Sequence, residues 1–167
     1  MVTLGLDAST TCVGYAFTED KKILDMGFID IKKETTPKEK VQKVLEYLNN
    51  SSYIDDVLDI NIEDNLSGFA GGRTSQQVII KLAKFNAILC FMLEEMFDYN
   101  VNSINPMTAR KNVFGKARVK GKKAKDFVKE EIEKRFKTKK WCKKTKTGLW
   151  DKRNIDMYDG LVMSLFS

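Results

Sequence analysis

The stretch LGLDASTTCVGYA, residues 4–16, holds the end of one predicted strand and the start of the next. Three apolar runs with strand-like patterns follow one another in this region: Val2 to Leu6, Cys12 to Phe17 and Ile23 to Ile31. The polar turn Glu19-Asp20-Lys21 joins the last two runs as a hairpin. We therefore expect the chain to begin with three antiparallel strands, and Asp7 to follow the first of them.

Helical and strand patterns alternate along the rest of the chain. The predicted elements are a helix from Pro37 to Asn49, a strand from Val57 to Ile62, a long helix capped by Ser75, a strand from Val101 to Ile104, a short helix from Pro106, a helix from Ala124 to Phe136 and a last helix capped by Asn154. This order predicts an α/β fold with a five-stranded mixed sheet, three antiparallel strands then two parallel ones, flanked by helices. Because neither an internal repeat nor a linker interrupts it, residues 1–167 are predicted to form a single domain.

The long helix after Ser75 is apolar on more than one face. Its main apolar face carries Val78, Leu82, Phe85, Leu89, Met92 and Met96 at helical spacing. The neighbouring face is also rather apolar: Ile79, Ala83, Ala87, Cys90 and Phe97. We expect burial on two sides, against the sheet and another helix, with a dimer interface as the alternative.

The composition indicates an ordered globular protein without a membrane segment. Hydrophobic residues make up 43% of the chain, charged residues 31%, and there are two prolines. The N-terminus lacks a signal-peptide pattern, and the longest apolar stretch, Ala87 to Leu93, is too short to span a bilayer. The three cysteines are widely spaced without a CxxC, so we expect reduced thiols and a cytoplasmic protein.

Histidine is absent from the chain, which removes the usual general base and the Ser-His and Cys-His nucleophile systems. Four acidic residues take its place as candidates. Asp7 follows the first strand and Glu63 the fourth, so the two carboxylates converge if these strands are neighbours. Asp156 and Asp159 are three residues apart at the start of the last helix, on one face.

Such a carboxylate cluster favours a bound cation. Two carboxylates about 4 Å apart repel each other by roughly 4 kcal/mol at an effective dielectric constant near 20. Oxygen ligands select Mg²⁺ or Mn²⁺, and a pair of such ions can hydrolyse a phosphodiester without a histidine. The sequence therefore predicts a site with two metal ions.

The positive charge is concentrated in one part of the chain. Residues Arg110 to Arg153 contain 19 basic and 5 acidic residues, a net charge of +14, whereas the rest contains 10 and 18, a net charge of −8. This segregation is typical of a nucleic-acid binder, although solubility or an acidic protein partner also accounts for it.

The stretches LGLDASTTCVGYA (4–16), DINIEDNL (59–66) and NIDMYDGLVMSL (154–165) resemble, in this order, the acidic motifs of RuvC-type Holliday-junction resolvases, particularly the short phage versions. These motifs cover about a fifth of the chain, and the predicted element order matches the ribonuclease H-like fold along nearly all of it. The resemblance implies a homodimeric, Mg²⁺-dependent endonuclease that places paired nicks across a four-way DNA junction. It implies Asp7, Glu63, Asp156 and Asp159 as catalytic metal ligands, no nucleotide cofactor, and the host cytoplasm if the protein is phage-encoded.

The resemblance also implies residues that bind DNA. Basic residues after the fifth strand and at the start of the next helix contact phosphates in that family, and the matching positions are Arg110 and Lys122, Lys123 or Lys125. An aromatic residue after the second acid disturbs base stacking; Phe69 is the candidate here and Leu66 its competitor. The alternatives are a solvated basic helix face and a phenylalanine packed in the core.

The segment KTKKWCKKTKTGLWDKR, residues 137–153, is longer and more basic than the family pattern requires. Its lysines and tryptophans suit binding of a DNA arm by charge and stacking. A loop whose tryptophans pack back on the domain is equally compatible with the sequence.

Three other functions fit parts of the sequence. LGLDASTT also looks like the first phosphate loop of actin and sugar-kinase ATPases, but those enzymes need two such domains and this chain has length for one. A ribonuclease H-like nuclease acting on structured RNA or RNA–DNA hybrids keeps the same site. A non-enzymatic nucleic-acid-binding protein would not need four acids at the ends of elements.

Overall fold

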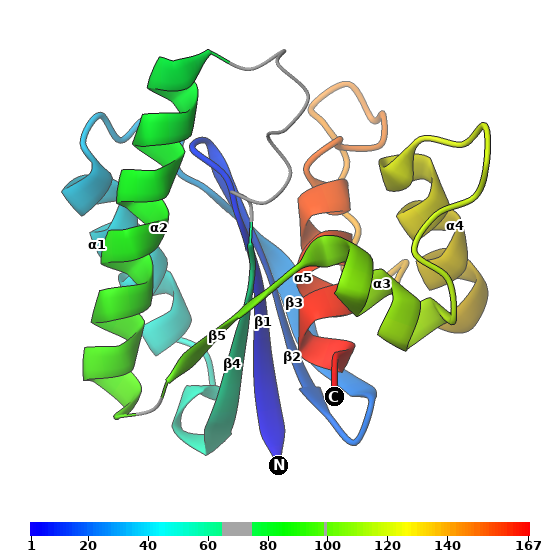
Figure 1. The fold of residues 1–167 in the computed structure, drawn as a ribbon, viewed down its shortest axis with the longest axis horizontal. Helices are drawn as coiled ribbons and strands as arrows, with labels where there is room; N and C mark the ends of the chain where they lie inside the picture. The colour runs from blue at the N-terminus through cyan, green and yellow to red at the C-terminus, as the bar shows by residue number, and fades with distance from the viewer. Residues whose placement is uncertain (65–74, 99) are drawn as a thin grey trace.

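The strands of this computed structural model, which describes residues 1–64, 75–98 and 100–167, form one mixed sheet (Figure 1). The strands are β1 (Val2–Ala8), β2 (Cys12–Glu19), β3 (Lys22–Asp30), β4 (Val57–Glu63) and β5 (Val101–Ile104), and their order in the sheet is β3-β2-β1-β4-β5. β1 pairs antiparallel with β2, as β2 does with β3, while β4 lies parallel to both β1 and β5. The predicted five-stranded mixed sheet is confirmed.

Helices cover both faces of the sheet. They are α1 (Pro37–Asn49), α2 (Gln76–Phe97), α3 (Pro106–Phe114), α4 (Ala124–Arg135) and α5 (Asn154–Leu165), with a short 3-10 turn at Ile54–Asp56. Figure 1 shows α1 and α2 on one side of the sheet and α3, α4 and α5 on the other. Each side has its own apolar core, and the second core is built around α5.

Local sequence explains where several elements begin and turn. Thr36 starts α1 with a capping box, in which its hydroxyl accepts from the Glu39 amide and the Glu39 carboxylate accepts from the Thr36 amide. Asp20 and Lys21 have φ angles of 48° and 62°, the left-handed conformations that a two-residue hairpin requires. β2 and β3 therefore pair directly across this turn.

Glycines let α5 lie directly against the sheet backbone. A Cβ atom on Gly5 would lie 2.1 Å from the Ser164 backbone nitrogen, and one on Gly14 would lie 1.8 Å from the Asp156 backbone oxygen. On the helix side, a Cβ on Gly160 would lie 2.9 Å from the backbone of Gly14. We call this contact the glycine seam; it fixes how close α5 and its acidic residues come to β1 and β2.

The start of α5 differs from our expectation. Asn154 was predicted to cap this helix, but it is the first helical residue, and Arg153 is the N-cap, without a side-chain cap bond. The buried Asn154 amide instead accepts from the Lys143 nitrogen at 2.9 Å and donates to the Lys143 oxygen at 2.8 Å. The amide thus ties the segment before α5 to the helix, a long-range role that sequence spacing does not reveal.

Only one face of α2 is buried, so the expectation of burial on two sides was wrong for the single chain. Leu82, Phe85, Leu89 and Leu93 pack into the core. Six large apolar side chains of α2 are exposed by between 38% and 58%, and we call them the α2 apolar face: Val78, Ile80, Ile88, Phe91, Met92 and Met96.

By length and composition alone, α2 is also the one helix of the described residues that meets the criterion for a membrane span, with a mean hydropathy of 1.4. Core helices of soluble proteins meet the same criterion when they are mostly buried, whereas 22% of the α2 window is buried.

Candidate metal centre

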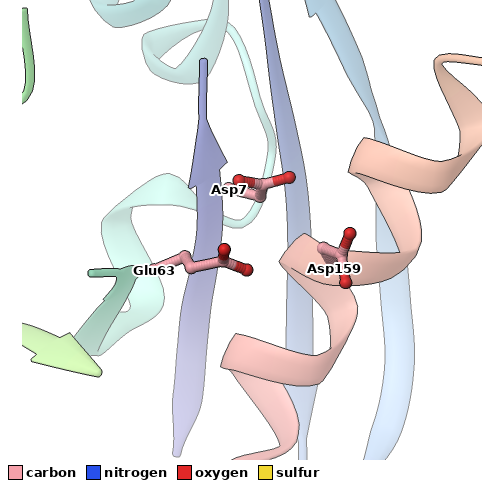
Figure 2. Close-up of side chains that lie close together, drawn as sticks. All are labelled: Asp7, Glu63 and Asp159. Carbon is pink, nitrogen blue, oxygen red and sulfur yellow. The ribbon is translucent and has the colours of Figure 1, made fainter. Parts of the chain in front are cut away.

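Three carboxylates converge where β1, β4 and α5 meet (Figure 2). β1 and β4 are parallel neighbours in which Leu6 pairs with Ile62, so Asp7 and Glu63 follow at the same end of the sheet. Asp159, on the second turn of α5, lies beside both. One oxygen of each carboxylate lies within 4.8 Å of the other two. This acidic triad has the donor set that a divalent cation prefers.

The triad is buried enough to penalise its negative charges. Asp7 is 8% exposed and Asp159 3% exposed. Burial raises the pKa of Asp7 well above its usual value, and the Glu63 and Asp159 charges add to the effect. Burial and the charge of Asp159 raise the pKa of Glu63 to about 7, and among the described residues Glu63 Oε2 has no hydrogen-bond partner. A cation between the three groups would remove this penalty.

Arg110, predicted to contact DNA, lies at the edge of the triad. It comes from α3, and its Nη2 donates to Asp159 Oδ1 at 3.4 Å. Its side chain is 12% exposed, and its Nε is buried without a hydrogen-bond partner in the described parts of the chain. Burial raises the pKa of Asp159, while the Arg110 charge opposes that rise. The guanidinium therefore already balances part of the negative charge.

Asp156, the fourth predicted acid, lies outside the triad, one turn before Asp159. Its Oδ1 pairs with Lys125 Nζ at 3.2 Å, and its charge adds to burial in raising the pKa of the nearby Cys12 thiol. Burial opposes the charge of Lys125, but Asp156 and Asp159 raise its pKa above the usual value. Sequence reasoning named Lys125 only as a DNA contact and missed Cys12, since both contacts arise from how α4 and β2 pack on α5.

The remaining predicted DNA-binding lysines form no ion pair with the four predicted acids in the described parts of the chain. Lys122 forms an ion pair with Glu130, and Lys123 is exposed directly before α4. Phe69 and its competitor Leu66 lie outside the described residues.

Both tryptophans of the segment 137–153 pack back on the domain. Trp141 Nε1 donates to Asp25 on β3 at 3.1 Å, and the Trp150 ring lies 6.5 Å from that of Tyr158 on α5. Most lysines of this segment are exposed. The structure thus packs both tryptophans against the domain, where they stay partly exposed, and leaves the positive charge at the surface.

Comparisons with known proteins identify the fold. A scan against models of protein families finds no match, and a sequence search of curated proteins finds none either. The structure matches that of Thermus thermophilus RuvC with a TM-score of 0.61 and 13% identity, over 99% of this chain and 92% of that one. It matches T. thermophilus RuvC in complex with a Holliday junction substrate with a TM-score of 0.64 and 12% identity, over 99% and 91% of the two chains. The RuvC-like, ribonuclease H-like fold expected from the motifs is confirmed.

Proposed function

We propose that this chain, as a single domain spanning residues 1–167 with the fold of RuvC, is a metal-dependent endonuclease that cleaves Holliday junctions and other branched DNA. The acidic triad of Asp7, Glu63 and Asp159 carries this proposal, because two buried carboxylates and one half-buried one, without a histidine, suit metal-dependent phosphodiester hydrolysis. The Holliday junction bound by the RuvC neighbour supports the choice of substrate. The proposed place of action is the cytoplasm, that of the host cell if the protein is phage-encoded.

The donor set fits Mg²⁺ or Mn²⁺. Carboxylate oxygens are the ligands that these ions prefer, and thiol or imidazole ligands are absent from the triad. We place Asp7, Glu63 and Asp159 as ligands, with Asp156 as a fourth ligand that allows a pair of ions. Bound ions would activate a water molecule and stabilise the leaving oxygen of the scissile phosphodiester.

The basic side chains beside the triad would hold the phosphate backbone. Arg110 lies against Asp159, and Lys125 is 64% exposed while it pairs with Asp156. A phosphate oxygen is an alternative partner for both cations, so each can turn from its carboxylate to the DNA. In that case Asp156 is released toward the metal ions as the substrate binds. Lys122 and Lys123 extend the basic surface along the start of α4.

We also infer that the active form is a homodimer. The α2 apolar face exposes six large side chains, and Phe91 alone is 58% exposed. Large apolar side chains exposed in this number on one helix favour an interface. Pairing of α2 with its copy about a two-fold axis would cover it and place two acidic triads symmetrically, as two opposed cuts in a four-way junction require.

A cleavage panel tests the proposed activity. The protein is incubated with a labelled four-way junction, a linear duplex of matching sequence and an RNA–DNA hybrid, with Mg²⁺, with Mn²⁺ or with EDTA. We expect paired cuts in the junction that need the metal. Asp7→Asn should cleave more than about 100-fold more slowly, because loss of a residue that only hydrogen-bonds to a metal ligand costs about 10- to 100-fold. Asp55→Asn, at an exposed aspartate, should cleave at the rate of the original protein. Preferred cleavage of the hybrid, or full activity of a folded Asp7→Asn protein, would overturn the proposal.

A further inference from the structure

A cavity of about 770 Å³ lies between the end of α4, the segment that follows it and the second turn of α5. Three aromatic side chains form part of its lining: Phe136, Trp150 and Tyr158. Five exposed lysines surround them: Lys137, Lys139, Lys140, Lys143 and Lys144. We call this cavity the lysine pocket. Its volume falls within the roughly 300–1,000 Å³ of ligand-binding pockets.

Buried polar contacts hold the wall of the lysine pocket in place. The Tyr158 hydroxyl donates to Glu133 Oε1 at 3.3 Å, and it lies 3.0 Å from Thr138 Oγ1 and 3.1 Å from Cys142 Sγ. Tyr158 and Thr138 are buried. These contacts join α4, the segment after it and α5, so the shape of the pocket follows from the packing of three elements.

The charge around the lysine pocket is unbalanced. Within the described ranges, none of its five lysines forms an ion pair, and Lys140 and Lys143 instead lie over the aromatic rings of Trp141 and Phe28 at 3.9 Å and 4.6 Å. Glu133 is the one acid in the lining, and its carboxylate accepts from Tyr158. The pocket therefore attracts an anion at its rim and an apolar, planar group at its aromatic wall.

An unpaired nucleotide has both of these properties. Its phosphates match the lysines, and its base can stack on an aromatic side chain, a contact that single-stranded DNA offers and a closed duplex does not. Tyr158 and Asp159 are consecutive on α5, and consecutive residues of a helix point about 100° apart. The lysine pocket thus lies around α5 from the acidic triad, on the side of α4.

We propose that the lysine pocket binds an unpaired nucleotide of single-stranded DNA, with its phosphates against the lysines. The base would stack on Phe136 and on the Trp150 ring, where it would replace Lys129 Nζ, which lies 4.2 Å from the ring centroid. This inference rests on the proposed function only for the origin of that strand, an opened arm of the branched DNA. It adds a second contact outside the metal centre, in the segment that is longer and more basic than the RuvC-type pattern.

The test measures binding of a labelled oligothymidylate by fluorescence anisotropy in EDTA, where no cleavage occurs. Lys139→Glu/Lys144→Glu removes two lysines that make no other side-chain contact recorded in the described residues. Lys21→Glu/Lys22→Glu makes the same charge change in the β2–β3 turn and at the first residue of β3. We expect the first pair to weaken binding and to lower the slope of log affinity against log salt by about 1.4, while the second changes neither. Trp150→Ala should weaken binding roughly 5- to 150-fold, the effect of losing one stacked base.

Equal affinities of the two charge-reversed proteins, or tighter binding of the matching duplex than of the single strand, would overturn the inference. Binding of free thymidine triphosphate as tight as that of the oligonucleotide would also overturn it, because the pocket would then be a mononucleotide site. Junction cleavage in Mg²⁺ is measured on the same proteins. If Lys139→Glu/Lys144→Glu loses single-strand binding but the original protein does not cleave the junction, the proposed function alone is refuted. If the original protein cleaves the junction with metal but Lys139→Glu/Lys144→Glu binds the single strand unchanged, the lysine pocket alone is refuted.

Discussion

Replacing Glu63 with glutamine is expected to stabilise the metal-free protein at alkaline pH. The pKa of Glu63 is about 7 in the folded chain against an ordinary value of 4.5. Between these values the folded chain holds a proton that the unfolded chain has lost, so stability falls as the pH rises through this interval. The full penalty, on the order of 3 kcal/mol, is present above pH 7. Glutamine keeps the shape of the side chain and cannot ionise.

Thermal melting in EDTA at several pH values measures the effect. In a chain of this size 1 kcal/mol shifts the melting temperature by about 2–4 °C, so Glu63→Gln should melt roughly 6–12 °C above the original protein near pH 8. The difference should vanish near pH 4, where both side chains are neutral. Glu46→Gln, at an exposed glutamate on α1, should change nothing.

Adding Mg²⁺ separates this explanation from a general effect of the substitution. A cation that binds only the folded chain stabilises it by about 2.7 kcal/mol at a hundred times its Kd. The original protein should therefore gain stability with Mg²⁺, and Glu63→Gln should gain little. A Glu63→Gln protein that melts at or below the original near pH 8 without metal contradicts the reasoning that burial and the charge of Asp159 penalise the ionised Glu63.

Three further substitutions test the glycine seam, the proposed dimer and Arg110. Gly14→Ala places a Cβ atom 1.8 Å from the Asp156 oxygen, so it should cost about 1–3 kcal/mol in thermal melting and slow junction cleavage; a stable, fully active variant would contradict the seam. Phe91→Glu should convert a dimer to a monomer in light scattering, whereas Leu58→Glu, at an exposed site on β4, should not. A monomeric original protein would refute the dimer. Arg110→Ala should lower the salt slope of junction binding in EDTA by about 0.9, and an unchanged slope would limit Arg110 to holding Asp159.

Much of the fold follows from local patterns in the sequence. Two elements have the bounds that the sequence predicts: the helix Pro37–Asn49 and the strand Val101–Ile104. The helix begins where expected because Thr36 caps it and Pro37 favours its first turn. The predicted inner face of α2 was right for Leu82, Phe85 and Leu89 but wrong for Val78, Met92 and Met96, which are exposed. Helical periodicity identifies an apolar surface, yet it does not say which part of that surface a neighbouring element covers.

The candidate site was predictable where neighbouring elements are regular. Asp7 and Glu63 meet because parallel neighbours end at the same edge, which the order of the strands indicates. The contact of Lys125 with Asp156 and that of Arg110 with Asp159 depend on how α3 and α4 pack on α5, and no short-range spacing encodes these contacts. The lysine pocket likewise depends on the path of the segment between α4 and α5.

The glycine seam bears on which ions the proposed metal centre would accept. The seam packs the α5 backbone directly against the backbones of β1 and β2, and this packing sets the distance between Asp159 and Asp7. Ca²⁺ binds oxygens at about 2.3–2.6 Å and tolerates irregular, crowded shells, whereas Mg²⁺ demands about 2.0–2.1 Å in a regular octahedron. A cation held between carboxylates at a set distance would therefore be selected by its ionic radius. The glycines of the seam would thus influence the size of cation that the proposed centre holds.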